Sequence, residues 1–526
     1  MLKLLPVCLL SLSLTLNAQQ TPHFSQYLPE APALSDYERV LLRYANDPGL
    51  QAAPGWKYLA RYAHAQSIRA EPDGSPADLA TLFTETRRIE AWKQTAGPGF
   101  RSAMWSPAGP FSAPTPNSDF LIEGTGRINT ITFHPTDPDI MWIGGGQGGL
   151  WKTTNGAASW FPLGDDLPVM RVSDIAVNPH DPDEMYLCIG DYAYLGFWIR
   201  TNDRKRNTHF GMGVYKSTDG GLTWNPTGLT FSQLDLDHSL TRRVFINPEN
   251  TSQLLAAGIH GIWMSEDAGD TWDMISEEII WDIEKDPADF RTLYASTAFI
   301  NNLQIGTAGI LKSTDFGETW TTLNTGIPAQ NQAQRIEISV SPVNPQTVYA
   351  VACNLNGGLY GFYRSTDGGQ SWELRASFPN ILHWSSGENS ISGQGSYDLA
   401  ILADPVMEDR VYVSGVNNWM SEDGGITWQG TSYWTGTYGP SVHADHHFLA
   451  YNPLDAQYYL CHDGGVSRTD TIKAGSWQEA LNNPDFRWPT KWEHLNNGLA
   501  NLSFYRLGIS QSSGNIFAGA QDMGTF

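Results

Sequence analysis

Cysteine, positive charge and long apolar runs are all scarce in this chain of 526 residues. It has only 4 cysteines, one of them Cys8 near the amino terminus, so no disulfide framework is expected from the other three. The 32 basic residues are outnumbered by 55 acidic ones, and a net charge of -23 repels nucleic-acid phosphates and anionic lipid surfaces. Beyond the amino terminus no run approaches the ~18 apolar residues that cross a bilayer, so no membrane span is expected.

The first 18 residues have the pattern of a signal peptide. Lys3 supplies a positive charge, Leu4–Leu16 is an apolar stretch, and Ala18 offers a small residue at the expected cleavage point. The mature chain is therefore expected to be secreted, either to the extracellular space or to the cell surface. Its 12% aromatic and 41% hydrophobic residues are enough for a large buried core and exclude a disordered chain.

Residues 19–105 are predicted to form a helical N-terminal region. Ser35 and Glu38 make a capping box before a helix that is expected to end near Asn46. Two more helices are predicted at 54–69 and 75–93. This region is either a packed cap on the next domain or a removable pro-segment, and the sequence leaves both possibilities open.

Residues 106–526 are repetitive. An octapeptide of the form Ser-x-Asp-x-Gly-x-Thr-Trp occurs five times, with Ser371 replacing Thr in one copy, and two degenerate copies end at Trp160 and Trp477. The repeat tryptophans lie 48 to 64 residues apart, a spacing typical of a four-stranded propeller blade. Because a tight hairpin needs Asp and Gly, we interpret the octapeptides as structural turns and not as metal or catalytic loops. Their marker residues are Asp219, Trp224, Asp267, Trp272, Asp315, Trp320, Asp367, Trp372, Asp423 and Trp428.

Each repeat also contains a strand that ends in a polar residue and proline, such as Asn178-Pro179, which favours a type I turn into a second strand. A third strand leads into the octapeptide and a fourth follows it. The sequence therefore predicts an all-β fold, a multi-bladed β-propeller of four-stranded antiparallel blades. About seven to eight blades are expected, the last one incomplete and the propeller truncated at the C-terminus, because first strands start near 127, 171, 242, 281, 335, 397, 443 and 503.

The octapeptides resemble the Asp-box, or bacterial neuraminidase (BNR) repeat, of sialidases, sortilin-type sorting receptors and xyloglucanase-type glycoside hydrolases. The Asn/Asp-Pro turns and the segment Gly148-Gly149-Leu150-Trp151 are most similar to the sortilin and xyloglucanase branch. The chain also resembles large secreted bacterial propellers that carry a C-terminal sorting domain, and no such domain occurs in these 526 residues. The resemblance covers about residues 125–526.

Binding loops are expected on the upper face of the propeller, which carries the two-to-three loops and the four-to-one crossovers. The proline turns and octapeptides lie on the opposite, lower face. Variable loops rich in Gly, Ser and aromatic residues favour a binding face. Aromatic platforms beside a carboxylate suit a sugar, and exposed tryptophan equally suits a protein partner. The candidate binding residues are Trp384, Tyr433, Trp434, Tyr438, His443, His447, Asn129 and Arg243.

His443, Asp445 and His447 share one face of a predicted strand. They could hold a divalent ion or form a hydrogen-bonded cluster that orders the crossover. Because histidine pairs at this spacing are common outside metal sites, no metal and no cofactor are assigned.

The enzyme classes implied by the resemblance fit this chain poorly. A sialidase would need an Arg-Ile-Pro motif, and none occurs. A xyloglucanase-type enzyme uses two carboxylates, and Asn129 replaces the aligned first-blade aspartate, although an amide cannot act as a general base. We therefore favour a non-enzymatic, sortilin-like propeller that binds a protein, peptide or glycan. The alternative is a polysaccharide-active glycoside hydrolase that uses Glu388, Asp398 or Asp445.

Overall fold

The structure is a computed structural model of the whole chain. It describes residues 34–46, 63, 88, 124–192, 211–231, 239–300, 304–328, 331–385, 390–435, 439–475, 482, 487–510, 512–513, 515–521 and 524–525. The chain divides into two compact units, Met1–Ser106 and Pro107–Phe526. Within the described part of the chain, no helix has the length and apolar character needed to cross a lipid bilayer.

The first unit contains helix α1 (Leu34–Asn46), which agrees with the helix predicted to end near Asn46. Tyr37 and Val40 are buried on one side of α1, and Asp36 in its first turn pairs with Arg39 at 2.7 Å. The expected signal peptide lies outside the described residues, as do the helices predicted at 54–69 and 75–93 apart from single positions.

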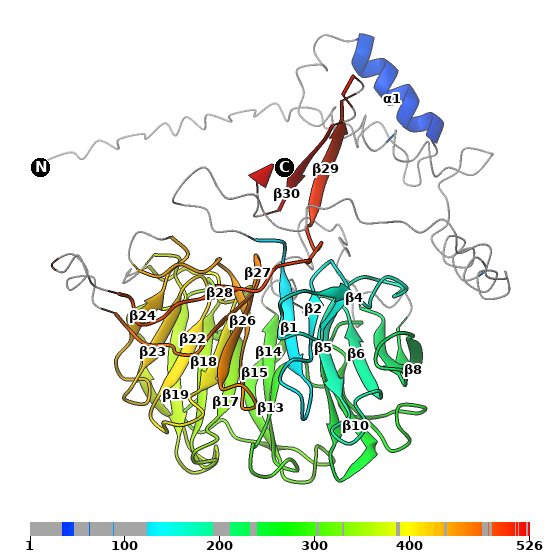
Figure 1. Cartoon of the computed structure of the whole chain (residues 1–526). Coiled ribbons are helices and arrows are strands. Elements are labelled where there is room, and N and C mark those ends of the chain that lie inside the picture. Colours follow the sequence, from blue (N-terminus) through cyan, green and yellow to red (C-terminus); the bar gives the residue numbers. More distant parts are fainter. Residues whose placement is uncertain are drawn as a thin grey trace, which may run out of the picture. The chain divides into compact units, whose positions relative to one another are not determined.

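The second unit contains seven four-stranded antiparallel sheets, each built from four consecutive strands (Figure 1). Blades 1 to 3 consist of β1 (Ile128–Phe133), β2 (Met141–Gly145), β3 (Leu150–Thr153), β4 (Phe161–Pro162); β5 (Val172–Val177), β6 (Met185–Ile189), β7 (Gly213–Ser217), β8 (Asn225–Thr230); and β9 (Thr241–Asn247), β10 (Asn250–Gly258), β11 (Gly261–Ser265), β12 (Asp273–Ser276). Blades 4 and 5 consist of β13 (Ile280–Lys285), β14 (Leu293–Ile300), β15 (Ile305–Ser313), β16 (Thr321–Thr322); and β17 (Ala333–Val340), β18 (Val348–Asn354), β19 (Leu359–Ser365), β20 (Glu373–Ala376).

Blades 6 and 7 consist of β21 (Ala400–Ala403), β22 (Val411–Ser414), β23 (Asn418–Ser421), β24 (Gln429–Ser432); and β25 (His446–Asn452), β26 (Gln457–His462), β27 (Gly465–Thr469), β28 (Glu493–His494). A further sheet of three strands consists of β29 (Phe504–Ile509), β30 (Ile516–Ala520) and β31 (Gly524–Thr525). The predicted all-β propeller with four-stranded blades is therefore confirmed.

The seven blades close into a ring through contacts between their first strands. β1 contacts β5, and this pattern continues around the ring until β25 contacts β1. Ile131 and Trp151 of blade 1 share one hydrophobic cluster with Tyr459 and Val466 of blade 7. Because every blade is a continuous stretch of chain, side-chain packing and loop hydrogen bonds close the ring, and no strand of the described residues is exchanged across this seam.

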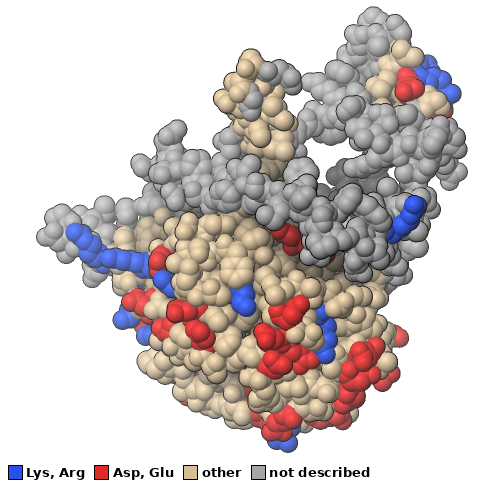
Figure 2. Space-filling view, turned by 45° about the vertical axis from the view of Figure 1, so that its right-hand side comes forward, with Lys and Arg blue, Asp and Glu red and all other residues tan. Residues whose placement is uncertain are grey.

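The second strand of each blade is buried on both faces because a neighbouring blade packs against each side of the sheet. All five residues of β6 are buried, and so are all eight of β14. This explains why these strands are almost continuously apolar instead of alternating with polar residues. Figure 2 shows acidic side chains on the described surface, with basic ones scattered among them, in keeping with the net charge of -23.

The octapeptides form the turns between the third and fourth strands. In blade 4, Asp315 Oδ1 accepts hydrogen bonds from the Ser313 hydroxyl (2.7 Å) and from the Thr319 amide (2.9 Å). Gly317 adopts a φ of 91°, which side chains rarely tolerate, and its amide donates to the Ser313 hydroxyl at 2.8 Å. The Phe316 amide donates to a carbonyl in the turn between the first two strands of the same blade, at 2.8 Å. Both turns therefore lie on one face, the lower face.

A basic residue directly before the octapeptide connects each of several blades to the next. In blade 4, Lys312 lies 4.9 Å from the ring centre of Tyr294, and both side chains donate to the carbonyl of Gly368 in blade 5, at 2.9 and 3.1 Å. We call this arrangement the inter-blade latch. At the seam of the ring, Arg468 of blade 7 donates to the carbonyl of Gly156 in blade 1 at 3.0 Å. Cation–π contacts like the one between Lys312 and Tyr294 also join Lys152 to Trp142, Lys216 to Tyr186 and Arg364 to Tyr349.

Candidate functional site

The first strands run down to the lower face, so the residues at their beginnings line the upper mouth of the central channel. Arg127 pairs there with Asp191, and its other terminal nitrogen donates to the Tyr397 hydroxyl at 3.1 Å. The Tyr397 hydroxyl donates to Asp463 Oδ2 at 2.7 Å, and His447 Nε2 lies 2.7 Å from Asp463 Oδ1. These five buried side chains, which we call the upper cluster, join blades 1, 2, 6 and 7.

His447 is neutral within the upper cluster. Burial, followed by the positive charges of Arg127 and Arg335, lowers the pKa of His447 well below its ordinary value. A neutral imidazole can still donate one hydrogen, and Asp463 accepts it. The cluster is therefore a stable hydrogen-bonded arrangement at neutral pH.

Asp398 lies directly beside the upper cluster and differs from it in having no partner. It is 1% exposed, and neither carboxyl oxygen has a hydrogen-bond partner among the described residues. Burial, together with the nearby carboxylates of Asp445 and Asp463, raises the pKa of Asp398 well above its ordinary value. Asp398 is therefore a carboxyl group that retains its proton to unusually high pH.

Arg335 holds the backbone on both sides of Asp398. Its guanidinium donates to the carbonyls of Tyr397 (3.1 Å) and Leu399 (2.8 Å), and it pairs with Glu337 at 2.7 Å. Since these donors are occupied by backbone oxygens and Glu337, Arg335 positions Asp398 without neutralising it. The rigid backbone explains how an unpaired carboxyl stays buried.

A second carboxyl group, Asp445, is more accessible than Asp398. It is partly exposed, adopts a φ of 63°, and accepts a hydrogen bond from Gln394 Nε2 at 3.0 Å. Gly415 lies between the two segments. Its carbonyl accepts a hydrogen bond from the His446 amide at 3.0 Å, and a Cβ at this position would lie 4.0 Å from Asp398 Oδ2. The structure thus brings Asp398 and Asp445, predicted from different blades, to one end of the channel.

Two exposed tryptophans lie beside the turn between β22 and β23. Trp384 is 56% exposed and Trp434 is 37% exposed. The Trp434 indole donates to the Trp384 carbonyl at 3.0 Å, and the Asn417 side chain bonds the backbone of both, at 3.1 Å in each case. This tryptophan pair is an aromatic surface held by Asn417, which lies two residues after Gly415, the residue that packs against Asp398.

The remaining candidate binding residues have other surroundings. The Tyr433 side chain folds back over its own strand: a Cβ placed on Gly430 would lie only 2.1 Å from the Tyr433 hydroxyl. The Asn129 amide donates to the Val172 carbonyl at 3.1 Å, between blades 1 and 2. Glu388 and Tyr438 lie outside the described residues.

The histidine segment does not assemble a metal site in the described part of the chain. The His443 carbonyl accepts a hydrogen bond from His446 Nε2 at 2.8 Å, and the His443 ring stacks on His462 at 5.8 Å. His447 is directed to Asp463 instead. This arrangement matches the alternative in which the histidines form a polar cluster that orders the crossover.

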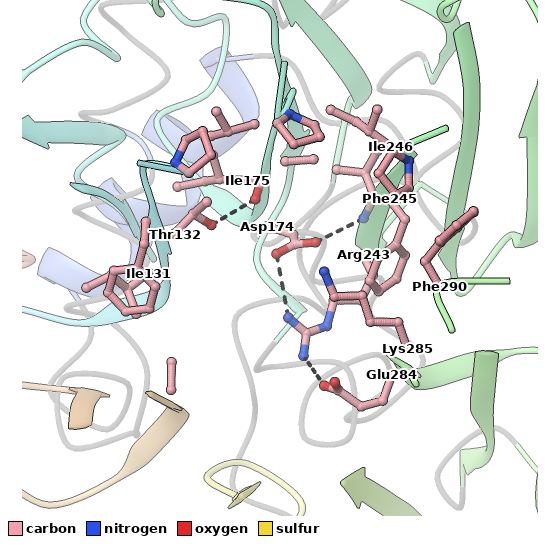
Figure 3. Close-up of a pocket in the computed structure, with 18 of the residues that line it drawn as sticks. Ile131, Thr132, Asp174, Ile175, Arg243, Phe245, Ile246, Glu284, Lys285 and Phe290 are labelled. Atoms are coloured by element: carbon pink, nitrogen blue, oxygen red, sulfur yellow. Dashed lines mark hydrogen bonds and ion pairs between the residues drawn. The ribbon is translucent and has the colours of Figure 1, made fainter. Parts of the chain in front are cut away.

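Arg243 lies lower in the channel, at a cavity of about 440 Å³ (Figure 3). Its guanidinium pairs with Glu284 at 3.0 Å and with Asp174 at 3.6 Å. Arg243 was predicted from the sequence as a binding residue, but the aromatic lining beside it, which comes from Phe133, Phe245, Phe290 and Phe448, was not. Phe133, Phe245 and Phe448 all lie on first strands, and this shared position was the signal from which an aromatic lining could have been predicted.

Sequence reasoning also missed Arg127, Asp191 and Tyr397 of the upper cluster. Asp191 and Asp463 each follow the end of a second strand, β6 and β26, at the upper face. An aspartate in this position of two blades was a detectable pattern. Arg127 and Tyr397 offered no such pattern, because their pairing joins blades 1 and 6 across the channel.

Comparisons with known proteins agree with this architecture. The family described as Sortilin-Vps10 (sortilin, neurotensin receptor 3) matches residues 260–400. A xyloglucanase of Paenibacillus sp. is 27% identical over 351 residues, which cover 58% of this chain and 31% of that protein. A xyloglucanase of Acetivibrio thermocellus is 25% identical over 359 residues, which cover 59% of this chain and 39% of that protein.

A solved structure of a GH74 xyloglucanase from Xanthomonas campestris superimposes with a TM-score of 0.54 at 16% identity, covering 78% of this chain and 60% of that one. The matched part of this chain spans well under half the length of the two xyloglucanases from Paenibacillus sp. and Acetivibrio thermocellus. The closed ring of seven blades agrees with the local match to sortilin and with the similarity to xyloglucanases. This chain carries a β-propeller that is similar to those of sortilin-type proteins and xyloglucanases.

Proposed function

We propose that the propeller is the polysaccharide-binding and polysaccharide-cleaving part of a secreted glycoside hydrolase that acts on a xyloglucan-like β-glucan. The observation that carries this proposal is the buried, unpaired carboxyl of Asp398 with its raised pKa, next to the more accessible carboxyl of Asp445. Glycoside hydrolysis needs two such groups, one that donates a proton and one that acts as a base or nucleophile. The similarity to xyloglucanases supports the substrate class.

In this proposal the two carboxyl groups have different roles because their surroundings differ. Asp398 retains its proton and supplies it to the glycosidic oxygen as the bond breaks, and because its carboxyl is buried, substrate binding must first expose it. Asp445 is the base that accepts a proton from the attacking water. Asn129 cannot perform the second role, so the base comes from blade 7 and not from blade 1. The tryptophan pair stacks on sugar rings and holds the chain over the channel mouth.

The test is the release of reducing ends from xyloglucan and other β-glucans by the 526-residue chain. We expect the wild type to release sugar, and Asp398→Asn and Asp445→Asn each to lower the rate by at least about 100-fold. Asp289→Asn, which changes an exposed aspartate in a lower turn, is the matched control and should retain full activity. No release by the wild type, or full activity of Asp398→Asn, would rule out the proposed mechanism.

A sortilin-like role in binding a protein or peptide is the second candidate. It is favoured by the Sortilin-Vps10 match, which includes Trp384, and by the high exposure of that side chain. Peptides selected from a displayed library would bind the wild type and lose affinity for Trp384→Ala. Cleavage of β-glucan that disappears in Asp398→Asn would argue for the first candidate instead.

A further inference from the structure

The central channel differs in chemistry between its two ends. Its upper mouth is lined by the polar side chains of the upper cluster, whereas the cavity of about 440 Å³ beside Arg243 has largely apolar walls (Figure 3). Among the described residues that line this cavity, none belongs to the upper cluster or to the tryptophan pair. The lining includes Pro135, Pro179 and Pro248 of the first turns in blades 1 to 3, so the cavity extends to the lower face. We call it the lower cavity.

Four phenylalanines from four different blades line the lower cavity. They are Phe133 of blade 1, Phe245 of blade 3, Phe290 of blade 4 and Phe448 of blade 7. All four are only partly buried, so part of each ring remains accessible to solvent. Because apolar surface in contact with water is unfavourable, a ligand that covers these rings gains stability from their burial.

Two of these rings are held in place by neighbouring side chains. Phe133 packs against Tyr459 with the ring centres 5.0 Å apart. The Phe448 ring centre lies 4.8 Å from the Arg243 guanidinium, which extends across from blade 3. Rings that are fixed before binding lose little conformational freedom when a ligand arrives. The lower cavity is therefore largely preformed.

The charged groups of the lining compensate one another. Arg243 pairs with Glu284 at 3.0 Å and with Asp174 at 3.6 Å, and Figure 3 shows its guanidinium between these two carboxylates. Asp174 also accepts a hydrogen bond from the Val244 amide at 2.9 Å. Lys285 is the second cation of the lining and balances the second carboxylate, so the lining has no net charge.

The charged groups in the channel wall nearby are balanced as well. Asp282 lies 3.5 Å from Arg243. Arg335 pairs with Glu337 at 2.7 Å, and Arg242 lies 3.9 Å from the same carboxylate. Four carboxylates thus face four cations around the cavity: Asp174, Asp282, Glu284 and Glu337 against Arg242, Arg243, Lys285 and Arg335. A charged ligand would lose its hydration here without gaining a charge that lacks compensation.

We propose that the lower cavity binds a neutral aromatic compound of two or three rings, which enters from the lower face. The volume determines the size, because a cavity of ~150 Å³ holds one benzene ring and the lower cavity is about three times larger. The balanced charges disfavour ionic ligands. The phenylalanine rings favour an aromatic over an aliphatic ligand, because offset-stacked and edge-to-face ring pairs are more stable than burial of apolar surface alone.

The charge of the ligand is tested with two fluorescent dyes that share one ring system. Phenylnaphthylamine is neutral and fluoresces more strongly when it leaves water, and anilinonaphthalene sulfonate carries the same rings with one negative charge added. We expect the wild type to bind the neutral dye at least about tenfold more tightly than the sulfonate in fluorescence titrations. Equal or tighter binding of the sulfonate overturns the proposal, and so does the absence of binding by the neutral dye.

The aromatic character of the ligand is tested by displacing the neutral dye with naphthalene or with decalin, its saturated counterpart. Each displacement constant is divided by the partition coefficient of the compound from water into an alkane, so that general hydrophobicity cancels. Naphthalene should then be at least about threefold more effective than decalin. Equal effectiveness would overturn the assignment of an aromatic ligand.

Three variants and a control locate the dye in the lower cavity. Ala450→Phe fills the cavity and should weaken binding at least about tenfold, whereas Ala158→Phe, at an exposed lower turn outside the lining, should change nothing. Phe245→Leu keeps the wall apolar but removes one ring, so binding should weaken about threefold. Phe517→Ser removes an exposed ring of the separate three-stranded sheet and should leave binding unchanged. Unchanged affinity in Phe245→Leu overturns the proposal even where Ala450→Phe fails to fold.

The proposed ligand site is independent of the proposed polysaccharide site at the other end of the channel. Asp398, which does not line the lower cavity, provides the check. Asp398→Asn should bind the neutral dye with the wild-type affinity, whether or not the wild type cleaves a β-glucan. A dye affinity that falls together with the loss of Asp398 would place the dye at the upper mouth and overturn the assignment to the lower cavity.

Discussion

Replacing Asp398 by asparagine is expected to stabilise the propeller increasingly as the pH rises, while it removes the proposed proton donor. Asp398 is 1% exposed and unpaired, and its pKa in the folded protein is raised by burial and by the neighbouring carboxylates. A raised folded-state pKa means that the folded protein binds this proton more tightly than the unfolded chain does. The resulting contribution to stability is complete at acid pH and is lost as the pH rises through the folded-state pKa.

The magnitude follows from proton linkage. Above the unfolded-state pKa of about 3.9, this one group lowers the free energy of unfolding by up to about 1.4 kcal/mol for each pH unit. Asparagine has almost the same shape and cannot ionise. The stability of Asp398→Asn relative to the wild type should therefore grow by up to about 2.7 kcal/mol between pH 5 and pH 7.

Urea denaturation followed by tryptophan fluorescence at several pH values measures this difference. Asp404 provides the matched control, because it is also 1% exposed but accepts hydrogen bonds from the Val406 amide (2.8 Å), the Met407 amide (2.9 Å) and the Tyr412 hydroxyl (2.6 Å). Asp404→Asn should lose about 1 to 3 kcal/mol. The reasoning is refuted if Asp398→Asn is less stable than the wild type at pH 7, or if its advantage does not change with pH.

Further variants test the turns, the seam and the tryptophan pair. Asp315→Ala removes the acceptor that holds one octapeptide turn, so the free energy of unfolding should fall by about 1 to 2 kcal/mol in urea denaturation, and an unchanged midpoint would contradict this role. Arg468→Met removes the latch at the seam, so backbone amide hydrogen exchange should accelerate where blades 7 and 1 meet. Lys216→Met, in blade 2, should leave exchange at this seam unchanged. Equal exchange at the seam in the two variants would refute the role of Arg468 in closing the ring. Trp434→Ala should weaken binding to xyloglucan in affinity electrophoresis by about tenfold, and full retention would exclude a sugar platform.

The blades could be predicted from the sequence because their determinants are local. The octapeptide from Ser313 to Trp320 contains both the hydroxyl and the carboxylate that bond the turn amides, so its structure depends on eight neighbouring residues. The closure of the ring could not be predicted in this way. Eight first strands follow one another in the sequence, but only the contact of β25 with β1 shows that seven blades complete the ring.

The candidate site was predictable in part for the same reason. Trp384 and Trp434 were predicted as binding residues because they lie in upper-face loops, and Asp398 and Asp445 were predicted as candidate carboxylates of the same face. Their different environments depend on groups from other blades, above all on Arg335, which was not a candidate. The preference for a non-enzymatic role rested on the missing Arg-Ile-Pro motif and on the substitution at Asn129. The sequence offered Asp398 and Asp445 as alternative carboxylates, but it could not show that Asp398 is buried without a hydrogen-bond partner among the described residues.

The continuity of each blade along the chain has a consequence for folding kinetics. Within each blade every strand pairs with the next one in the sequence, and these contacts therefore span short stretches of chain. Such pairings form quickly because little loop entropy is lost. The contact of blade 7 with blade 1 spans more than 300 residues, as between Arg468 and Gly156, and carries the largest entropic cost. Blades should therefore form one after another as the chain emerges from the ribosome, and the closing of the seam should be the last and slowest step.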